Sequence, residues 1–173
     1  MHGYWLIKTP EPVASYVSFV QVGNLLYLSG RGPIRASGTY ITGKLGDNVS
    51  IDSGYYAARL VAIAHLSVVK KALGSLQKVK QIVKVFGMVN ATSDFVHQPK
   101  VINGYSDLMV AVFGNKGMHA LSAVGMASLP SNRCVEVEVI VEVEEVKSKK
   151  CSFQVLMIVN DLLLCSSSLV PPF

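Results

Sequence analysis

Residues 135–144, VEVEVIVEVE, alternate in character with a strict period of two. Five valines fall on one side of this stretch: Val135, Val137, Val139, Val141 and Val143. Four glutamates and Ile140 fall on the other side. Such alternation is typical of a β-strand with one face on a core and the other on water or a partner. The valine face needs helices or a second sheet to cover it, which limits the chain to a sheet packed on at least one side.

The stretch before this strand predicts another strand and a turn. Residues 122–129 are small and apolar, and Pro130, Ser131 and Asn132 are turn formers. The sequence therefore predicts two closing strands joined by a turn.

The rest of the chain predicts two helices and three more strands. A helix over residues 51–73 is bounded by Ser50, a good N-cap, and by Gly74, which suits the first position after a helix. A second helix is predicted over residues 100–113, and further strands over residues 16–22, 25–29 and 79–90. The order β-β-α-β-α-β-β predicts an α+β fold with a single sheet and both helices on one of its faces.

Length and composition favour one domain in residues 16–146, preceded by an N-terminal segment, 1–15. The net charge is +5, but the lysines are scattered, which argues against a nucleic-acid groove. The three cysteines show no C-x-x-C pair and no zinc spacing, so no metal site is predicted. No basic region followed by an apolar core opens the chain, and a cytoplasmic location is expected, with an organelle left open.

Residues 147–173 form an atypical C-terminal tail. Asn160 and Asp161 break its apolar run, and the unbroken part is shorter than the roughly 20 residues that a membrane helix needs. We favour a variant tail that forms no essential part of the fold. A C-terminal membrane anchor and an aggregation-prone segment that packs on the sheet are the alternatives.

Several motifs together resemble the RidA/YjgF family of reactive-intermediate deaminases. They are HALSAVGMASLP followed by VEVEVIVEV, and also VGNLLYLSG, ALGSLQKVKQIVKV and FVHQPKVINGYSDLMVAVFG. The resemblance implies a chorismate-mutase-like fold and a homotrimer with clefts between subunits. It also implies hydrolysis of enamines or imines from amino acids to 2-keto acids and ammonia, without a cofactor.

The family's cleft positions correspond to seven residues of this chain. They are Tyr16, Ser29, Gly30, Asn103, Leu121, Ser122 and Glu136. Glu136 keeps the carboxyl group that positions water or moves protons. Leu121 stands where the family has an arginine that binds the substrate carboxylate, so deaminase activity is expected to be impaired. Arg31 is a candidate substitute for that missing cation.

The same residues also permit other interpretations. A non-catalytic trimer that binds a small metabolite in its clefts or a protein partner on its surface is the alternative function, and Leu121 favours it. Without the resemblance, the sequence pattern alone predicts that Glu136 belongs to a solvent-exposed face of the strand. His65 and His119 have no carboxylate partner in a motif, so core or surface positions are expected for them. Cys134 is expected to be structural.

Overall fold

The computed structural model describes residues 15–144. The predicted tail, 147–173, and all but the last residue of the predicted N-terminal segment, 1–15, lie outside the described residues. Within residues 15–144, no helix is long and apolar enough to cross a membrane.

The described chain has the predicted element order, β-β-α-β-α-β-β, with three short 3-10 turns. The strands are β1 (Phe19–Val22), β2 (Leu25–Arg31), β3 (Val79–Asn90), β4 (Ala120–Met126) and β5 (Val135–Val143). The helices are α1 (Ile51–Leu73) and α2 (Gln98–Phe113), and the 3-10 turns are η1 (Leu76–Lys78), η2 (Gly114–Gly117) and η3 (Pro130–Asn132). All five strands form one sheet, in the order β1-β2-β5-β3-β4.

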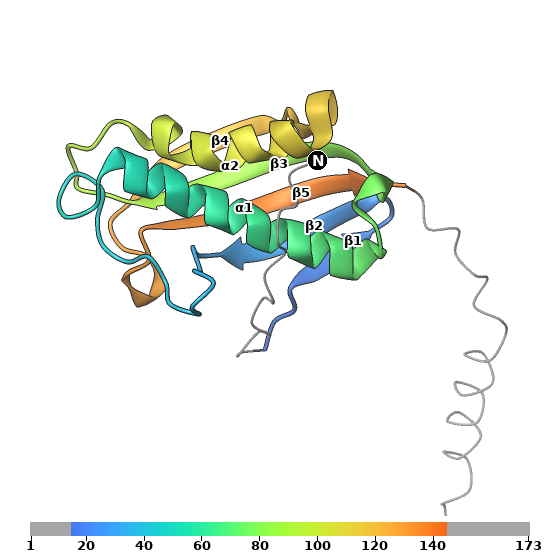
Figure 1. Cartoon of the computed structure of the whole chain (residues 1–173), viewed down its shortest axis with the longest axis horizontal. Helices are drawn as coiled ribbons and strands as arrows, with labels where there is room; N and C mark the ends of the chain where they lie inside the picture. Colours follow the sequence, from blue (N-terminus) through green and yellow to red (C-terminus); the bar gives the residue numbers. More distant parts are fainter. Residues whose placement is uncertain (1–14, 145–173) are drawn as a thin grey trace, which may run out of the picture.

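Both helices lie on the same face of this sheet, so the molecule has two layers (Figure 1). Helix α1 contacts β2 and β5, and α2 contacts β3 and β4. All five odd-numbered valines of β5 are buried under the helices, and the alternation in the sequence is thereby confirmed. The helices also approach each other closely, because a Cβ on Gly104 of α2 would overlap the backbone carbonyl of Tyr55 in α1.

Local signals set the bounds of α1. The Ser50 side chain accepts a hydrogen bond from the backbone N–H of Ser53, which satisfies one free donor of the first turn. Gly74 adopts a left-handed conformation with φ of 77°, and its N–H donates to the carbonyl of Lys70. The predicted range of this helix, 51–73, is confirmed.

The two closing strands are not neighbours in the sheet. Strand β3 lies between them, parallel to β4 and antiparallel to β5. The turn between them is present, with Ser131 and Asn132 at positive φ. A parallel neighbour needs a crossover connection, and α2 supplies it between β3 and β4.

Other predicted bounds were wrong by a few residues. Strand β1 starts at Phe19, β2 continues to Arg31, α2 starts at Gln98, and β4 runs from Ala120 to Met126. Strand β2 extends beyond its predicted end at Ser29, because it continues through a bulge between Leu28 and Arg31.

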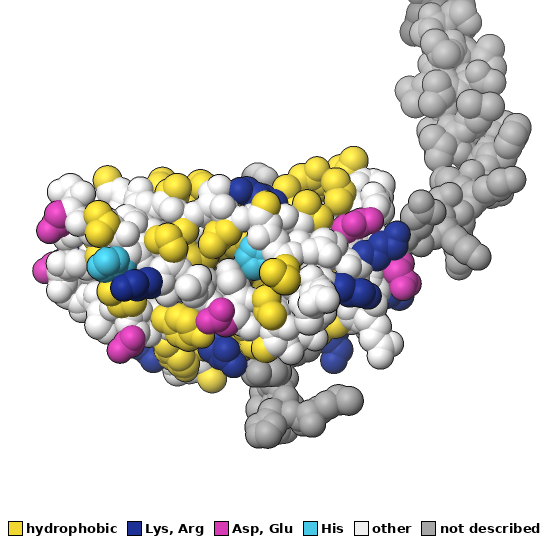
Figure 2. Space-filling view, turned by 90° about the horizontal axis from the view of Figure 1, so that it is seen from above, with side chains coloured by type: hydrophobic (Ala, Val, Ile, Leu, Met, Phe, Trp, Pro, Cys, Tyr) yellow, Lys and Arg dark blue, Asp and Glu magenta, His cyan; other side chains and the backbone are white. Residues whose placement is uncertain are grey.

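The sheet face opposite the helices stays partly uncovered. Apolar side chains of four strands lie on it: Val20, Val22, Tyr27, Phe86 and Ile140. The face seen from above Figure 1, which is a different view from the uncovered sheet face, carries basic and acidic side chains interspersed with hydrophobic ones, and no block of one charge is visible on it (Figure 2).

Candidate functional site

The bulge in β2 brings three of the predicted residues together. Leu28 pairs with Val139 and Arg31 with Val137, so three steps along β2 face two along β5. The extra residue lies at Ser29 and Gly30. Bulges of this kind turn side chains and backbone groups away from the regular ladder and are common beside active sites.

Hydrogen bonds from both sides hold the bulge. The Ser29 N–H donates to the Ser18 carbonyl at 3.1 Å, and the Ser29 hydroxyl donates to the Val17 carbonyl at 2.6 Å. On the helix side, Nε2 of His65 lies 3.3 Å from the Ser29 carbonyl oxygen. Tyr16 is exposed in the segment just before Val17. The bulge is therefore fixed from the core and from the chain that leads into β1.

Glu136 lies directly against Gly30. A Cβ on Gly30 would overlap Oε1 of Glu136, so the absence of a side chain at Gly30 leaves space for this carboxyl group in its present position. Glu136 is half-buried, and burial raises its pKa, with a further upward contribution from Glu138, while the charge of Arg133 lowers it. A carboxyl group with a raised pKa can both accept and donate a proton nearer neutral pH.

Arg31 is anchored beside the same bulge. Its Nη2 donates to the Ser18 hydroxyl at 2.9 Å. It pairs with Val137, a core valine, and its positive charge helps to lower the pKa of buried His65. These contacts direct Arg31 toward the helix side, whereas Glu136 points to the opposite face.

The remaining predicted residues lie at the other edge of the sheet. Asn103 is exposed on α2, Leu121 is 37% exposed on β4, and the Ser122 hydroxyl accepts a hydrogen bond from Nζ of Lys84 at 2.7 Å. These three residues form a second group near the β4 edge, and strand β3 lies between β4 and the strand that carries Glu136.

Strand register shows how far apart the two groups are in one chain. Glu136 pairs with Met88, which pairs with Val124, three residues beyond Leu121. Two strand spacings and three residues of strand separate Leu121 from Glu136 by roughly 14 Å. Leu121 also shares the face of its partner, the core residue Val85, whereas Glu136 has the opposite face.

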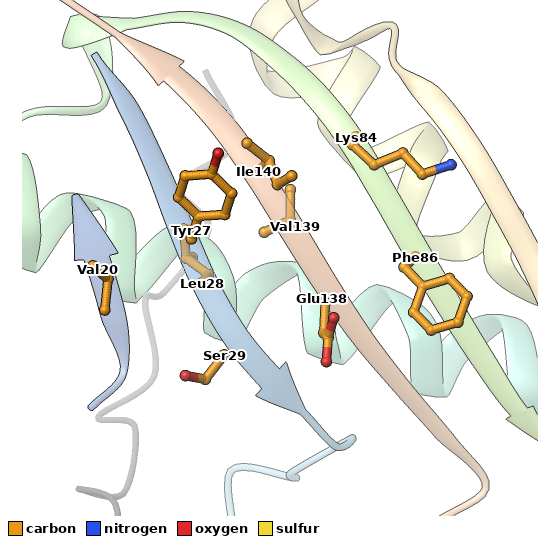
Figure 3. Close-up of a pocket in the computed structure, with 9 residues that line it drawn as sticks. All are labelled: Val20, Tyr27, Leu28, Ser29, Lys84, Phe86, Glu138, Val139 and Ile140. Carbon is orange, nitrogen blue, oxygen red and sulfur yellow. The ribbon is translucent and has the colours of Figure 1, made fainter. Parts of the chain in front are cut away.

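A hollow of about 390 Å³ adjoins the first group. It is lined by nine residues of β1, β2, β5 and β3: Val20, Tyr27, Leu28, Ser29, Lys84, Phe86, Glu138, Val139 and Ile140. The Glu138 carboxylate and the Lys84 ammonium point in different directions here (Figure 3), and Lys84 reaches toward β4. The hollow opens on the sheet face that the helices do not cover.

The contacts of His65, His119 and Cys134 fit structural roles for these three residues. His65 is buried in the core, where burial lowers its pKa to about 3. His119 bonds the Gly117 carbonyl and the Ser106 hydroxyl. Cys134 is buried, and burial raises its pKa to about 11, so its thiol is a poor nucleophile. No cluster of three His, Cys, Asp or Glu residues that could hold a metal ion occurs in residues 15–144.

Sequence reasoning did not single out Arg133. This residue follows the turn of η3 and precedes the strand that carries Glu136. Its guanidinium lies over the Tyr40 ring, 4.2 Å from the centroid, and a Cβ on Gly32 would overlap its side chain. The sequence feature that could have indicated Arg133 was its position just before the start of β5, three residues before Glu136.

Comparisons with known proteins agree with this architecture. Residues 3–143 match a family model described as "YjgF/chorismate_mutase-like, putative endoribonuclease". Protein TCP17 of Trypanosoma cruzi is 42% identical over 140 residues, which cover 79% of this chain and 88% of that protein. A 2-iminobutanoate/2-iminopropanoate deaminase of Dermatophagoides farinae is 32% identical over 136 residues, covering 78% of this chain and 91% of that protein.

A solved structure extends the agreement to three dimensions. Protein Atu1372 of Agrobacterium tumefaciens superimposes with a TM-score of 0.74 at 45% identity, covering 79% of this chain and 88% of that one. The sheet of five strands with two helices on one face therefore has the YjgF/chorismate-mutase-like fold. The chain belongs to the RidA/YjgF family.

Proposed function

We propose that this chain hydrolyses reactive enamines or imines of amino-acid origin to 2-keto acids and ammonia. The observation that carries the proposal is the half-buried carboxyl group of Glu136 against Gly30. A proton-handling group with a raised pKa lies there beside a backbone bulge that is held from both sides. The named deaminase relative, at 32% identity, supports the same chemistry.

The reaction needs a water molecule, a proton acceptor and a site for a carboxylate. Ionised Glu136 takes a proton from water as the oxygen adds to the imine carbon, and a carbinolamine forms. The protonated carboxyl returns this proton to nitrogen, and the carboxylate then carries the hydroxyl proton to nitrogen as well, so that the C–N bond breaks and ammonia leaves as the carbonyl forms. The sum is imine plus water giving ketone plus ammonia, so no oxidant or cofactor is consumed.

The proposed site lies between copies of the chain, in a homotrimer of the family type. Leu121 and Ser122 are far from Glu136 within one chain and lie at the β4 edge, so a second copy is needed to bring the two groups together. The uncovered apolar face, with Phe86 and Ile140, supports burial against other copies.

A non-catalytic module that binds a metabolite or a protein is the second candidate. Leu121 favours it, because an apolar side chain cannot pair with a carboxylate at the place where the family has arginine. In this case the cleft would still bind its ligand, but the protein would not catalyse the reaction. A measurable affinity for 2-keto acids without ammonia release is the expected signature.

Ammonia release from freshly generated 2-aminoacrylate tests the two candidates. The wild-type protein should accelerate release, and Glu136→Gln should lower the accelerated rate by about 10²- to 10⁴-fold, the range typical of a lost acid–base group. Glu144→Gln is the matched control, since Glu144 is an exposed glutamate just beyond the same strand. A wild-type rate equal to the uncatalysed rate would reject the deaminase and leave the binding module.

A further inference from the structure

Arg133 is a half-buried cation without an acceptor. Its side chain makes no hydrogen bond or ion pair to any other residue in the range 15–144, and its Nε is buried. Its guanidinium carbon lies over the face of Tyr40, 4.2 Å from the ring centroid. A buried donor without a partner is costly, and a guanidinium offers five donors in a fixed plane.

Packing fixes the orientation of this guanidinium. The aromatic ring of Tyr40 covers one face, and the missing side chain of Gly32 leaves space for the Arg133 stem. The Arg133 side chain is therefore already ordered in the folded protein, and binding an anion would cost it little further conformational entropy. Two oxygens of a carboxylate match the guanidinium plane, and a carboxylate is the anion that the proposed imine or keto-acid substrate carries.

The Arg133 side chain lies close to the Glu136 carboxyl. Glu136 lies against Gly30 and the Arg133 stem lies against Gly32, so the two side chains lie beside glycines that are two residues apart in the chain. The charge of Arg133 also opposes the rise in the pKa of Glu136, although no ion pair between the two groups is present in the described part of the chain.

We propose that Arg133 binds the carboxylate of a small 2-keto or 2-imino acid and so holds its C2 carbon beside Glu136. The role in deamination rests on the function proposed above, while the carboxylate site itself does not. Arg133 would then serve in place of an arginine at position 121. This differs from the sequence-based expectation for Arg31, whose contacts are with Ser18 and the helix side of the bulge.

Titration of 2-ketobutyrate into the full-length protein, followed by calorimetry, tests the proposal. Arg133→Gln should weaken binding by about 10- to 100-fold, the effect of losing a charged, two-point contact. Arg133→Lys keeps the charge without the planar fork and should lose roughly tenfold. Arg35→Gln is the matched control, because it removes the same charge from an exposed position in the same loop region and should bind like the wild type.

Three results would overturn the proposal: unchanged binding by Arg133→Gln, no binding of 2-ketobutyrate by the wild type, or a loss confined to Arg31→Gln. Thermal unfolding shows whether Arg133→Gln is folded. If it is not, Arg133→Lys decides, and equal affinity in that variant rejects the assignment. Arg133-dependent binding without ammonia release would reject the deaminase and keep this site.

Discussion

His65 connects the helical core to the site through the carbonyl oxygen of Ser29, 3.3 Å from its Nε2. A carbonyl only accepts, so Nε2 carries the proton, and Nδ1 accepts from the Tyr105 hydroxyl at 3.0 Å. The chain of contacts runs from α2 through α1 to the bulge beside Gly30. The packing of the two helices thereby sets the backbone position against which Glu136 lies.

Acid should destabilise the protein through His65. Burial lowers its pKa to about 3 in the folded state, against 6.5 in the unfolded chain, so the unfolded chain binds the proton more readily. The stability that neutral His65 contributes is complete above pH 6.5 and is lost as the pH falls toward about 3. The loss is roughly 1.4 kcal/mol per pH unit within that window.

Urea unfolding at about pH 7.5 and about pH 4.5 measures this loss in the free energy of unfolding. His65→Gln removes the titrating group, so its stability should fall less between the two pH values. His119→Gln is the control and should keep the wild-type slope. Parallel slopes in the wild type and His65→Gln would contradict the assignment.

Gly104 should be intolerant of any side chain. A Cβ there would overlap the Tyr55 carbonyl of α1, so Gly104→Ala must push the helices apart at a cost of about 1–3 kcal/mol in the free energy of unfolding. Asn103→Ala, at the exposed neighbouring position, should change that free energy by less than about 0.5 kcal/mol. Chemical denaturation of both variants checks the difference; equal stabilities would mean that α2 can shift freely.

Local patterns were sufficient to predict α1 and the core face of β5. The N-cap Ser50 and the left-handed Gly74 act within a few residues of the helix ends, and the valine alternation lies within a single strand. The family resemblance supplied the fold that these elements build, and the matching family model agrees.

Contacts between distant parts of the chain could not be predicted in the same way. The insertion of β3 between β4 and β5 depends on sheet pairing over long separations, and no local pattern encodes that order. Arg133 acquires its surroundings from Tyr40 and Gly32, about 100 residues earlier in the sequence. The β2 bulge is likewise defined by its register with β5.

The uncovered sheet face should be the interface of the proposed trimer. Ile140→Glu would place a charge among Tyr27 and Phe86 on that face, and it should shift the protein toward monomers without unfolding it. Val110→Glu is the control, because Val110 is exposed on α2, away from that face. Sedimentation velocity at several concentrations measures the distribution. A wild-type monomer at every concentration would remove the intersubunit cleft.

Leu121→Arg should strengthen carboxylate binding, because Leu121 is 37% exposed at the β4 edge, where a long cation has space. We expect 2-ketobutyrate to bind roughly tenfold more tightly to this variant, the effect of one charged hydrogen bond, as calorimetry would measure. Combining Leu121→Arg with Arg133→Gln separates two arrangements. If both arginines serve one carboxylate, Arg133→Gln should cost less affinity in the Leu121→Arg background than in the wild type. Additive effects would mean that the two positions act on separate sites, and no gain in Leu121→Arg would mean that β4 does not border a cleft at all.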